Sequence, residues 1–185
     1  DMITQTVYIQ SGLWKFRLIP RSIRNGRYDM WLPAQGALNF GTGFTSPDSA
    51  STFTIPSAAA KAVTVGAYDA GTGSAAPFSG RGYIVEIGGS LMVKPELAAP
   101  GVNVLVPSVS GMARVNGTSY ATPFVTGSAA LLMEWGIVRG NDAFLYGEKL
   151  KAYLIKGAEP LAGAAVPDTQ TGWGRLCLKN SLPQA

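Results

Sequence analysis

The chain has 185 residues, enough for one domain with a substantial core. Charged residues make up 14% of the sequence, well below the roughly 25% typical of soluble domains, while 23 Gly and 12 Pro supply many turns. This composition argues against intrinsic disorder and against a coiled coil. The net charge is +4, and the basic cluster Arg17, Arg21, Arg24 and Arg27 lacks the interleaved aromatic residues of a nucleic-acid surface. We therefore expect no nucleic-acid partner.

Two residue counts exclude further classes of site. Histidine is absent, which excludes a His-based zinc site and a His catalytic base within this chain. The single cysteine, Cys177, excludes an internal disulfide, and we expect it to be a small buried hydrophobe. No apolar run reaches roughly 18 residues, so the sequence predicts no membrane span, and its start does not resemble a signal peptide.

Residues 1–54 have the pattern of β-structure. Short segments alternate apolar and polar residues, and Asn25-Gly26 is a hairpin-turn signal. This region is typical of the last strands of a β-sandwich or jelly roll. Because the sequence begins inside a strand-like segment, we expect the chain to be a fragment.

From Thr54 onward the pattern changes to that of an α/β domain. Residues 62–67 and 102–106 are short apolar runs, which predict strands buried on both faces, and 112–115 is a shorter strand candidate. A second helix is expected from about 147 to 156, with Gly157 as its C-cap.

The clearest helix prediction covers residues 119–135. Inward positions follow i+3 and i+4 spacing at Ala121, Val125, Ser128, Leu132 and Trp135. The other faces are also small or apolar, which predicts a helix that is buried all round. Pro123 is tolerated only in a first turn, so the helix should begin at Ser119 or Tyr120.

Ser119 lies at the predicted strand-to-helix junction and allows two interpretations. Serine is a favoured N-cap, and the local pattern alone favours that role. The same position can also present a nucleophile together with one backbone N–H that stabilises an oxyanion.

The surrounding residues resemble a known family. Residues 117–127, Gly-Thr-Ser-Tyr-Ala-Thr-Pro-Phe-Val-Thr-Gly, are similar to the active-site serine motif of the subtilisin-like serine proteases (subtilases, peptidase S8 family). Phe124 replaces a His that is usual in the motif and is not catalytic. Further blocks of the family pattern occur in the right order at 64–67 with 78–82, at 94–102 and at 172–176. The resemblance covers about residues 54–182.

Residues 1–54 resemble a different part of that family. Residues 11–14 and 26–33 are similar to the jelly-roll insertion of a clostridial-type subtilase group, which includes spore-germination proteases. The resemblance implies an α/β fold in which residues 55–185 form the C-terminal part of a subtilisin-like parallel-sheet domain. A few antiparallel strands from the end of the jelly-roll insertion, residues 1–54, would precede it.

The resemblance also implies a function and a site. The parent protein would be a serine endopeptidase that hydrolyses a peptide or protein substrate by acyl transfer, with Ser119 as nucleophile and the Ser119 N–H as one oxyanion donor. Pro56 and Ser57 would form part of the wall of the primary specificity pocket. The catalytic His and Asp and the oxyanion Asn would lie upstream, Asn116 not being that residue, so this chain alone should be inactive. We expect no cofactor and no metal, although Asp69 and Glu96 flank family strands and nearby acids bind a cation in some subtilases.

Two alternatives from other functional classes stay open at this point. One is a subtilase-like pseudoprotease that acts as a binding or sensing protein, and the other is an interaction domain in which Ser119 is only a helix cap. The expected partners are the upstream part of the same protein and, through apolar edges at 62–67 and 102–106, a second copy of the chain. The resemblance is compatible with export to a bacterial surface or spore.

Overall fold

The computed structural model describes residues 10–26, 28–33 and 35–183. They belong to two compact units, Asp1–Thr42 and Gly43–Ala185. The described residues of the first unit form no strand, and their one regular element is the 3₁₀ turn η1 (Gln35–Ala37).

The antiparallel strands expected in residues 1–54 are therefore not found among the described residues of that region. Residues 1–9, where part of this prediction falls, lie outside the described residues. A pair of strand segments is marginal in water unless a third strand or a helix covers its apolar face. Leu13 and Phe16 are correspondingly 85% and 77% exposed. The assignment to a jelly roll stays a prediction.

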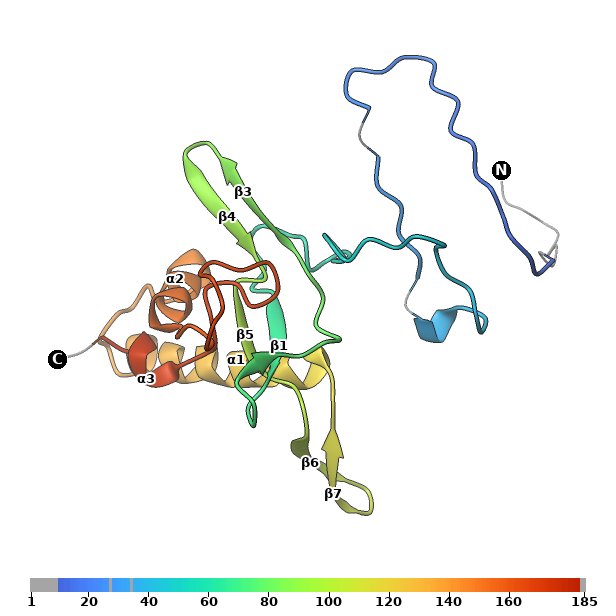
Figure 1. Cartoon of the computed structure of the whole chain (residues 1–185). Coiled ribbons are helices and arrows are strands. Elements are labelled where there is room, and N and C mark those ends of the chain that lie inside the picture. The colour runs from blue at the N-terminus through green and yellow to red at the C-terminus, as the bar shows by residue number, and fades with distance from the viewer. Residues whose placement is uncertain (1–9, 27, 34, 184–185) are drawn as a thin grey trace, which may run out of the picture. The chain divides into compact units, whose positions relative to one another are not determined.

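The described part of the second unit contains three small sheets, three α-helices and one π-helical turn (Figure 1). The strands are β1 (Val65–Asp69), β2 (Ser74–Ala75), β3 (Tyr83–Ile87), β4 (Ser90–Lys94), β5 (Leu97–Pro100), β6 (Val104–Ser108) and β7 (Gly111–Val115). The helical elements are α1 (Thr118–Met133), the π-helical turn η2 (Glu134–Val138), α2 (Gly147–Gly157) and α3 (Leu178–Ser181). The α/β class is confirmed.

The central sheet has the strand order β2-β1-β5. β1 and β5 are parallel, with Val65 opposite Leu97 and Tyr68 opposite Pro100. β1 confirms the predicted buried strand, but it lies between two other strands. Residues 62–67 thus do not form the exposed apolar edge that was expected.

The second buried strand is β5 rather than the expected segment 102–106. β6 covers most of that segment and pairs with β7 in an antiparallel hairpin, where Leu105 is 53% exposed. The chain leaves the central sheet after Pro100, and a φ of 53° at Asn103 turns the backbone just before β6. The β6–β7 hairpin and the β3–β4 hairpin project from opposite sides of the second unit (Figure 1).

The main core lies between the central sheet and α1. Ala67 of β1 and Leu97 of β5 pack with Ala121, Val125 and Leu132 of α1. The inward positions predicted from helical spacing are buried, apart from Trp135, which is partly buried. α2 covers the predicted segment, with Leu154 in the same core, but Gly157 is its last helical residue and Ala158, not Gly157, is the C-cap.

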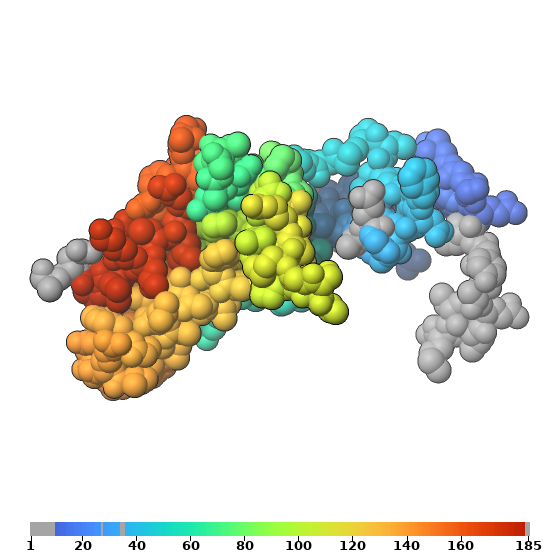
Figure 2. Space-filling model, turned by 90° about the horizontal axis from the view of Figure 1, so that it is seen from below, coloured from blue at the N-terminus to red at the C-terminus, as the bar shows by residue number. Residues whose placement is uncertain are grey.

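Two features of α1 differ from the predictions. The helix begins at Thr118, so Pro123 lies in its second turn rather than its first. Its outer face is exposed, with Phe124 at 43% and Leu131 at 56%, so α1 is not buried all round. Figure 2 shows α1 and η2, yellow to orange, at the surface of the second unit.

The stretch Thr118–Val138 is long and apolar enough, with a mean hydropathy of 1.2, to cross a membrane by length and composition alone. This differs from the expectation from the sequence. Its inner face, however, packs against β1, β5 and α2, as a core helix of a folded domain does.

A buried ion cluster ties the segment before β1 to β4, β5 and α2. The Glu96 carboxylate contacts the Nζ of Lys94 at 2.8 Å and the Nζ of Lys151 at 2.5 Å, and it accepts the Thr64 N–H at 2.7 Å. Lys94 also donates to the Ala62 carbonyl at 2.7 Å. Because both charges of the Lys94–Glu96 pair are almost fully buried, each depends on the other for compensation.

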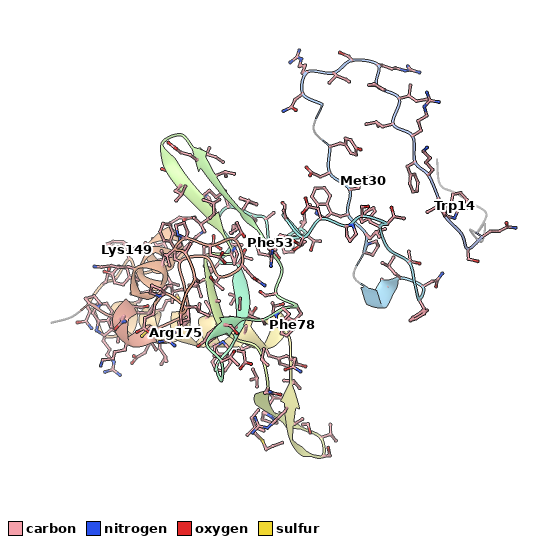
Figure 3. The ribbon with its side chains drawn as sticks, in the orientation of Figure 1. Trp14, Met30, Phe53, Phe78, Lys149 and Arg175 are labelled. Atoms are coloured by element: carbon pink, nitrogen blue, oxygen red, sulfur yellow. The ribbon has the colours of Figure 1, made fainter. Side chains whose placement is uncertain are left out.

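The 78–82 block forms a turn that packs on an aromatic side chain. A Cβ placed on Gly80 would lie 3.0 Å from the Phe53 ring, which is labelled in Figure 3, and one on Gly82 would lie 2.2 Å from the Lys94 carbonyl oxygen and 2.9 Å from the same ring. Ser79 Oγ accepts the Ala67 N–H at 2.9 Å and so joins this turn to β1. Glycines at these positions let the turn approach Phe53.

The close packing at Gly101, directly after β5, generates a stability prediction. A Cβ on Gly101 would lie 2.6 Å from the Ala67 Cβ and 3.0 Å from the Gly117 carbonyl oxygen. We expect Gly101→Ala to lower the free energy of unfolding by about 1–3 kcal/mol, as overpacking of a core does. Denaturant unfolding checks this, with Gly43→Ala as the control because a Cβ there meets nothing within 4 Å. Equal stabilities of the two variants would contradict the prediction.

Candidate active site

Ser119 is the second residue of α1, and its side chain is exposed. The turn before it is fixed to the sheet, because the Gly117 N–H donates to the Gly101 carbonyl at 2.8 Å and the Gly101 N–H donates to the Tyr68 carbonyl at 3.0 Å. Gly101 follows β5, and Tyr68 lies near the end of β1. Ser119 is therefore held at the carboxyl ends of two parallel strands, where ligands bind in open α/β sheets.

Two glycines make this arrangement possible. At Gly101 there is no room for a Cβ between Ala67 and the Gly117 carbonyl. Gly117 has a φ of 149°, a conformation that favours glycine. Gly101 lies in the 94–102 block of the family pattern, where no separate role was expected for it.

The start of α1 bears on the interpretation of Ser119 as a helix cap. Gly117 is the N-cap, with no side-chain capping bond, and the helix has already begun at Thr118. Ser119 is therefore not the cap. Its backbone N–H belongs to the first turn, whose N–H groups have no intrahelical acceptor, and it lies at the positive end of the helix dipole. Ser119 thus combines an exposed hydroxyl with a backbone N–H that has no acceptor within the helix.

The described residues place no proton acceptor next to this hydroxyl. In the part of the chain that the structure describes, Ser119 Oγ has no hydrogen-bond partner. Tyr68, although its carbonyl lies nearby, packs its ring with Ala98 and Leu161 in a separate cluster from α1. Burial raises the pKa of Tyr68, against a smaller opposing effect of Arg175, so it stays a neutral phenol. The sequence contains no His that could take the proton of this hydroxyl.

Asn116 has a structural role. Its Oδ1 accepts the Asn103 N–H at 2.7 Å, while the Asn103 carbonyl accepts from Arg114 at 3.1 Å. These bonds join the two ends of the β6–β7 hairpin at its base. The expectation that Asn116 is not the oxyanion asparagine stays a prediction.

Pro56 and Ser57 lie on a turn before β1, after a cis Ile55–Pro56 peptide bond. The Ser57 carbonyl accepts from Thr64 Oγ1 at 2.6 Å, which ties this turn to the amino end of β1. Ser119 is tied to the carboxyl end of the same strand. The described residues thus do not bring Ser57 and Ser119 into contact, and the role of Pro56 and Ser57 as a pocket wall stays a prediction.

The two acids considered for a cation are engaged in the protein. Asp69 accepts the Gly71 N–H at 2.8 Å, and Glu96 is held by two ammonium groups. Among the described residues, no group of three or more His, Cys, Asp or Glu side chains is placed to hold a metal ion.

Comparisons with known proteins agree with this geometry. The sequence profile of the subtilase family matches residues 22–174. The structure of the CspB protease of Clostridium perfringens is 42% identical with a TM-score of 0.71, and the match covers 78% of this chain and 30% of that one. The prenylagaramide maturation protease PagA is 29% identical with a TM-score of 0.57, covering 72% of this chain and 46% of that one.

The self-cleaved protease domain of PatA is also similar. It is 29% identical with a TM-score of 0.53, and the match covers 69% of this chain and 42% of that domain. The chain thus spans less than half of each of these three structures. The family profile extends over most of the 185 residues and includes Ser119 with its helix. The chain therefore belongs to the subtilase family.

Proposed function

We propose that the protein containing this chain is a serine endopeptidase, and that the chain is the C-terminal part of its catalytic domain. The observation that carries the proposal is Ser119 itself. It is an exposed serine at the positive end of α1, with its own N–H free of the helix and its position fixed by Gly101. The similar structures are described as proteases, which supports the same chemistry.

In this proposal Ser119 Oγ attacks the scissile carbonyl carbon of a peptide substrate. The carbonyl oxygen becomes an oxyanion, which accepts a hydrogen bond from the Ser119 N–H and is favoured by the α1 dipole. A His from the upstream part of the protein takes the hydroxyl proton and later gives it to the leaving amine, and an upstream Asp orients that His. An upstream Asn supplies the second oxyanion donor. The acyl-enzyme is then hydrolysed by water.

The chain alone is proposed to be inactive. A serine hydroxyl is a weak nucleophile near neutral pH unless a base accepts its proton, and the sequence contains no His. The match to only 30% of the CspB chain supports the idea that a longer protein carries the remaining groups.

The exposed outer face of α1 supports the same idea. Phe124, Leu131 and Val138 are 43%, 56% and 77% exposed. The outer groove of η2 is lined by Ala130, Met133, Ile137 and Val138, together with Glu134, whose carboxylate pairs with Arg139. Isolated apolar side chains on a surface are common, but a mostly apolar helix face is typical of an interface. We propose that the upstream part of the catalytic domain covers it. Export to a bacterial surface or spore stays a prediction.

The nucleophile assignment predicts the effect of Ser119→Ala in the full-length protein. Cleavage of a peptide library should fall by a factor on the order of 10⁴ or more, because removal of a triad member costs that much. The free energy of unfolding should change by less than about 0.5 kcal/mol, since the Ser119 side chain is exposed. Peptide turnover and thermal unfolding measure the two effects.

Ser110→Ala is the matched control, because Ser110 is an exposed serine on the β6–β7 turn. It should leave cleavage unchanged. Normal cleavage by the Ser119→Ala protein would refute the nucleophile assignment. A native protein that neither cleaves peptides nor reacts with a fluorophosphonate at Ser119 would instead favour the pseudoprotease alternative.

The proposed cover over α1 is tested by cysteine accessibility in the full-length protein. Leu131→Cys should react with a thiol reagent far more slowly than Val109→Cys, because Leu131 would be covered while Val109 lies fully exposed on the β6–β7 turn. Mass spectrometry of the labelled peptides reports both rates. Similar rates at the two positions would show that the face stays open. Protection that weakens on dilution would assign the face to a second copy of the chain instead.

A further inference from the structure

The β3–β4 hairpin exposes apolar side chains and two strand edges. Its residue pairs run from Tyr83–Lys94 to Ile87–Ser90, and among the described residues no third strand joins this sheet. Ile87 is 58% exposed and Leu91 is 48% exposed. A two-stranded hairpin is marginal in water until a further strand or a helix packs with it. This hairpin, which extends away from the central sheet (Figure 1), therefore calls for a partner.

The turn of the hairpin determines which backbone groups face outward. The two-residue turn Gly88–Gly89 has φ values of 60° and 76°, as in a type I′ turn. The residues that flank such a turn, here Ile87 and Ser90, exchange both backbone hydrogen bonds, and bonded and non-bonded pairs then alternate along the strands. The N–H and C=O groups of Ile84 and Glu86 therefore point away from β4, along the outer edge of β3.

The other hairpin of this unit carries a block at the equivalent edge. β6 and β7 are also joined by a two-residue turn, at 109–110, so by the same alternation Pro107 faces outward and offers no N–H. Arg114 adds a charge on β7. Proline and charged side chains are two means by which strand edges avoid pairing. Residues 83–93 contain no proline and no basic residue, and their single charge is Glu86.

The outer edge of β3 is complementary to itself. Antiparallel pairing of β3 with β3 of a second copy, about a two-fold axis at Val85, places Ile84 opposite Glu86 of that copy. These are the two residues whose backbone groups point outward, so their hydrogen bonds match. Tyr83 then lies opposite Ile87 of the second copy on the other face. Aromatic and β-branched side chains in such cross-strand pairs stabilise a sheet.

Charge and burial favour this register and this edge. A shift of the two-fold axis from Val85 to Glu86 would place two carboxylates directly opposite each other, which is destabilising. With the axis at Val85, each carboxylate lies opposite an isoleucine instead. The outer edge of β4 is less accessible, because Val93 and Lys94 near its end are only 4% and 0% exposed.

We propose that a second copy of the protein binds along the outer edge of β3, so that two hairpins join into one four-stranded antiparallel sheet. The pairing gives each hairpin a third strand and covers the apolar side chains of β3. The second copy expected from the sequence would thus bind at an edge other than 62–67 and 102–106. β3 lies on a different element from Ser119 and from the outer face of α1, so the inference does not depend on the proposed function.

Sedimentation of the full-length protein over a range of concentrations tests the pairing. The native protein should form a dimer that dissociates on dilution. Glu86→Pro should weaken self-association by more than about tenfold, because it removes an outward N–H from the edge of each copy. The N–H of residue 86 points away from β4, so the hairpin keeps its own hydrogen bonds, and thermal unfolding checks that the fold is retained. Glu86→Gln is the matched control, since it keeps the N–H and should dimerise at least as well as the native protein.

Disulfide trapping tests the register in the same protein. Val85→Cys places two thiols opposite each other at the two-fold axis, at a Cα separation that a disulfide spans. Mild oxidation should therefore link two copies, which non-reducing electrophoresis detects. Glu86→Cys is the control, because in this register its Cα lies beyond the roughly 7 Å limit from the same residue of the second copy. Both variants carry Cys177→Ser, so that the native thiol does not react.

Each outcome supports or overturns the inference. A dimer that Glu86→Pro weakens and Val85→Cys traps supports it. A native protein that stays monomeric at every concentration overturns it, and slow reaction of Val85→Cys with a thiol reagent in that monomer would show that another part of the same protein covers β3. A dimer that persists in Glu86→Pro, with no cross-link through Val85→Cys, uses another surface and overturns it as well.

Discussion

The close approach of α1 to the central sheet at Gly101 is the constraint on which the site depends. Ala67 in β1, Gly101 after β5 and the turn at Gly117 meet at distances that leave no room for a side chain at position 101. Two hydrogen bonds, from the Gly117 N–H to the Gly101 carbonyl and from the Gly101 N–H to the Tyr68 carbonyl, link the turn before α1 to the ends of both parallel strands. Ser119, two residues after Gly117, takes its position from the backbone of the sheet rather than from its own side-chain contacts.

The two ends of the β1–β5 pair are stabilised by different physical means. At the carboxyl ends, backbone hydrogen bonds and glycines position the exposed Ser119. At the amino ends, the Glu96 carboxylate joins Lys94, Lys151 and the Thr64 N–H in a buried cluster. Removal of one partner from a buried ion pair leaves an uncompensated buried charge, so the members of this cluster depend on one another. Buried charges hold the amino ends, and glycines with backbone hydrogen bonds hold the carboxyl ends.

The sequence predicted those features that depend on local periodicity or on a complete motif. β1 and the inward positions of α1 follow from apolar runs and from i+3 and i+4 spacing, and Ser119 follows from its motif. It did not predict that α1 begins at Thr118, because the rule for proline in helices argued for a later start. The segment 102–106 was assigned to the interior since apolar runs do not distinguish a buried strand from an exposed hairpin. The all-round apolar pattern of α1 predicted complete burial, whereas its outer face is exposed in this chain.

The central claim is that Ser119 offers both its hydroxyl and its N–H to one substrate carbonyl. The most direct test is a crystal structure of the full-length protein after reaction with a phosphonate inhibitor, whose phosphoryl group mimics the tetrahedral intermediate. The account predicts a covalent bond from Ser119 Oγ to phosphorus, with a phosphoryl oxygen within about 3 Å of the Ser119 nitrogen. An adduct on another residue, or a Ser119 N–H that bonds within the protein instead of to the phosphoryl oxygen, would contradict it.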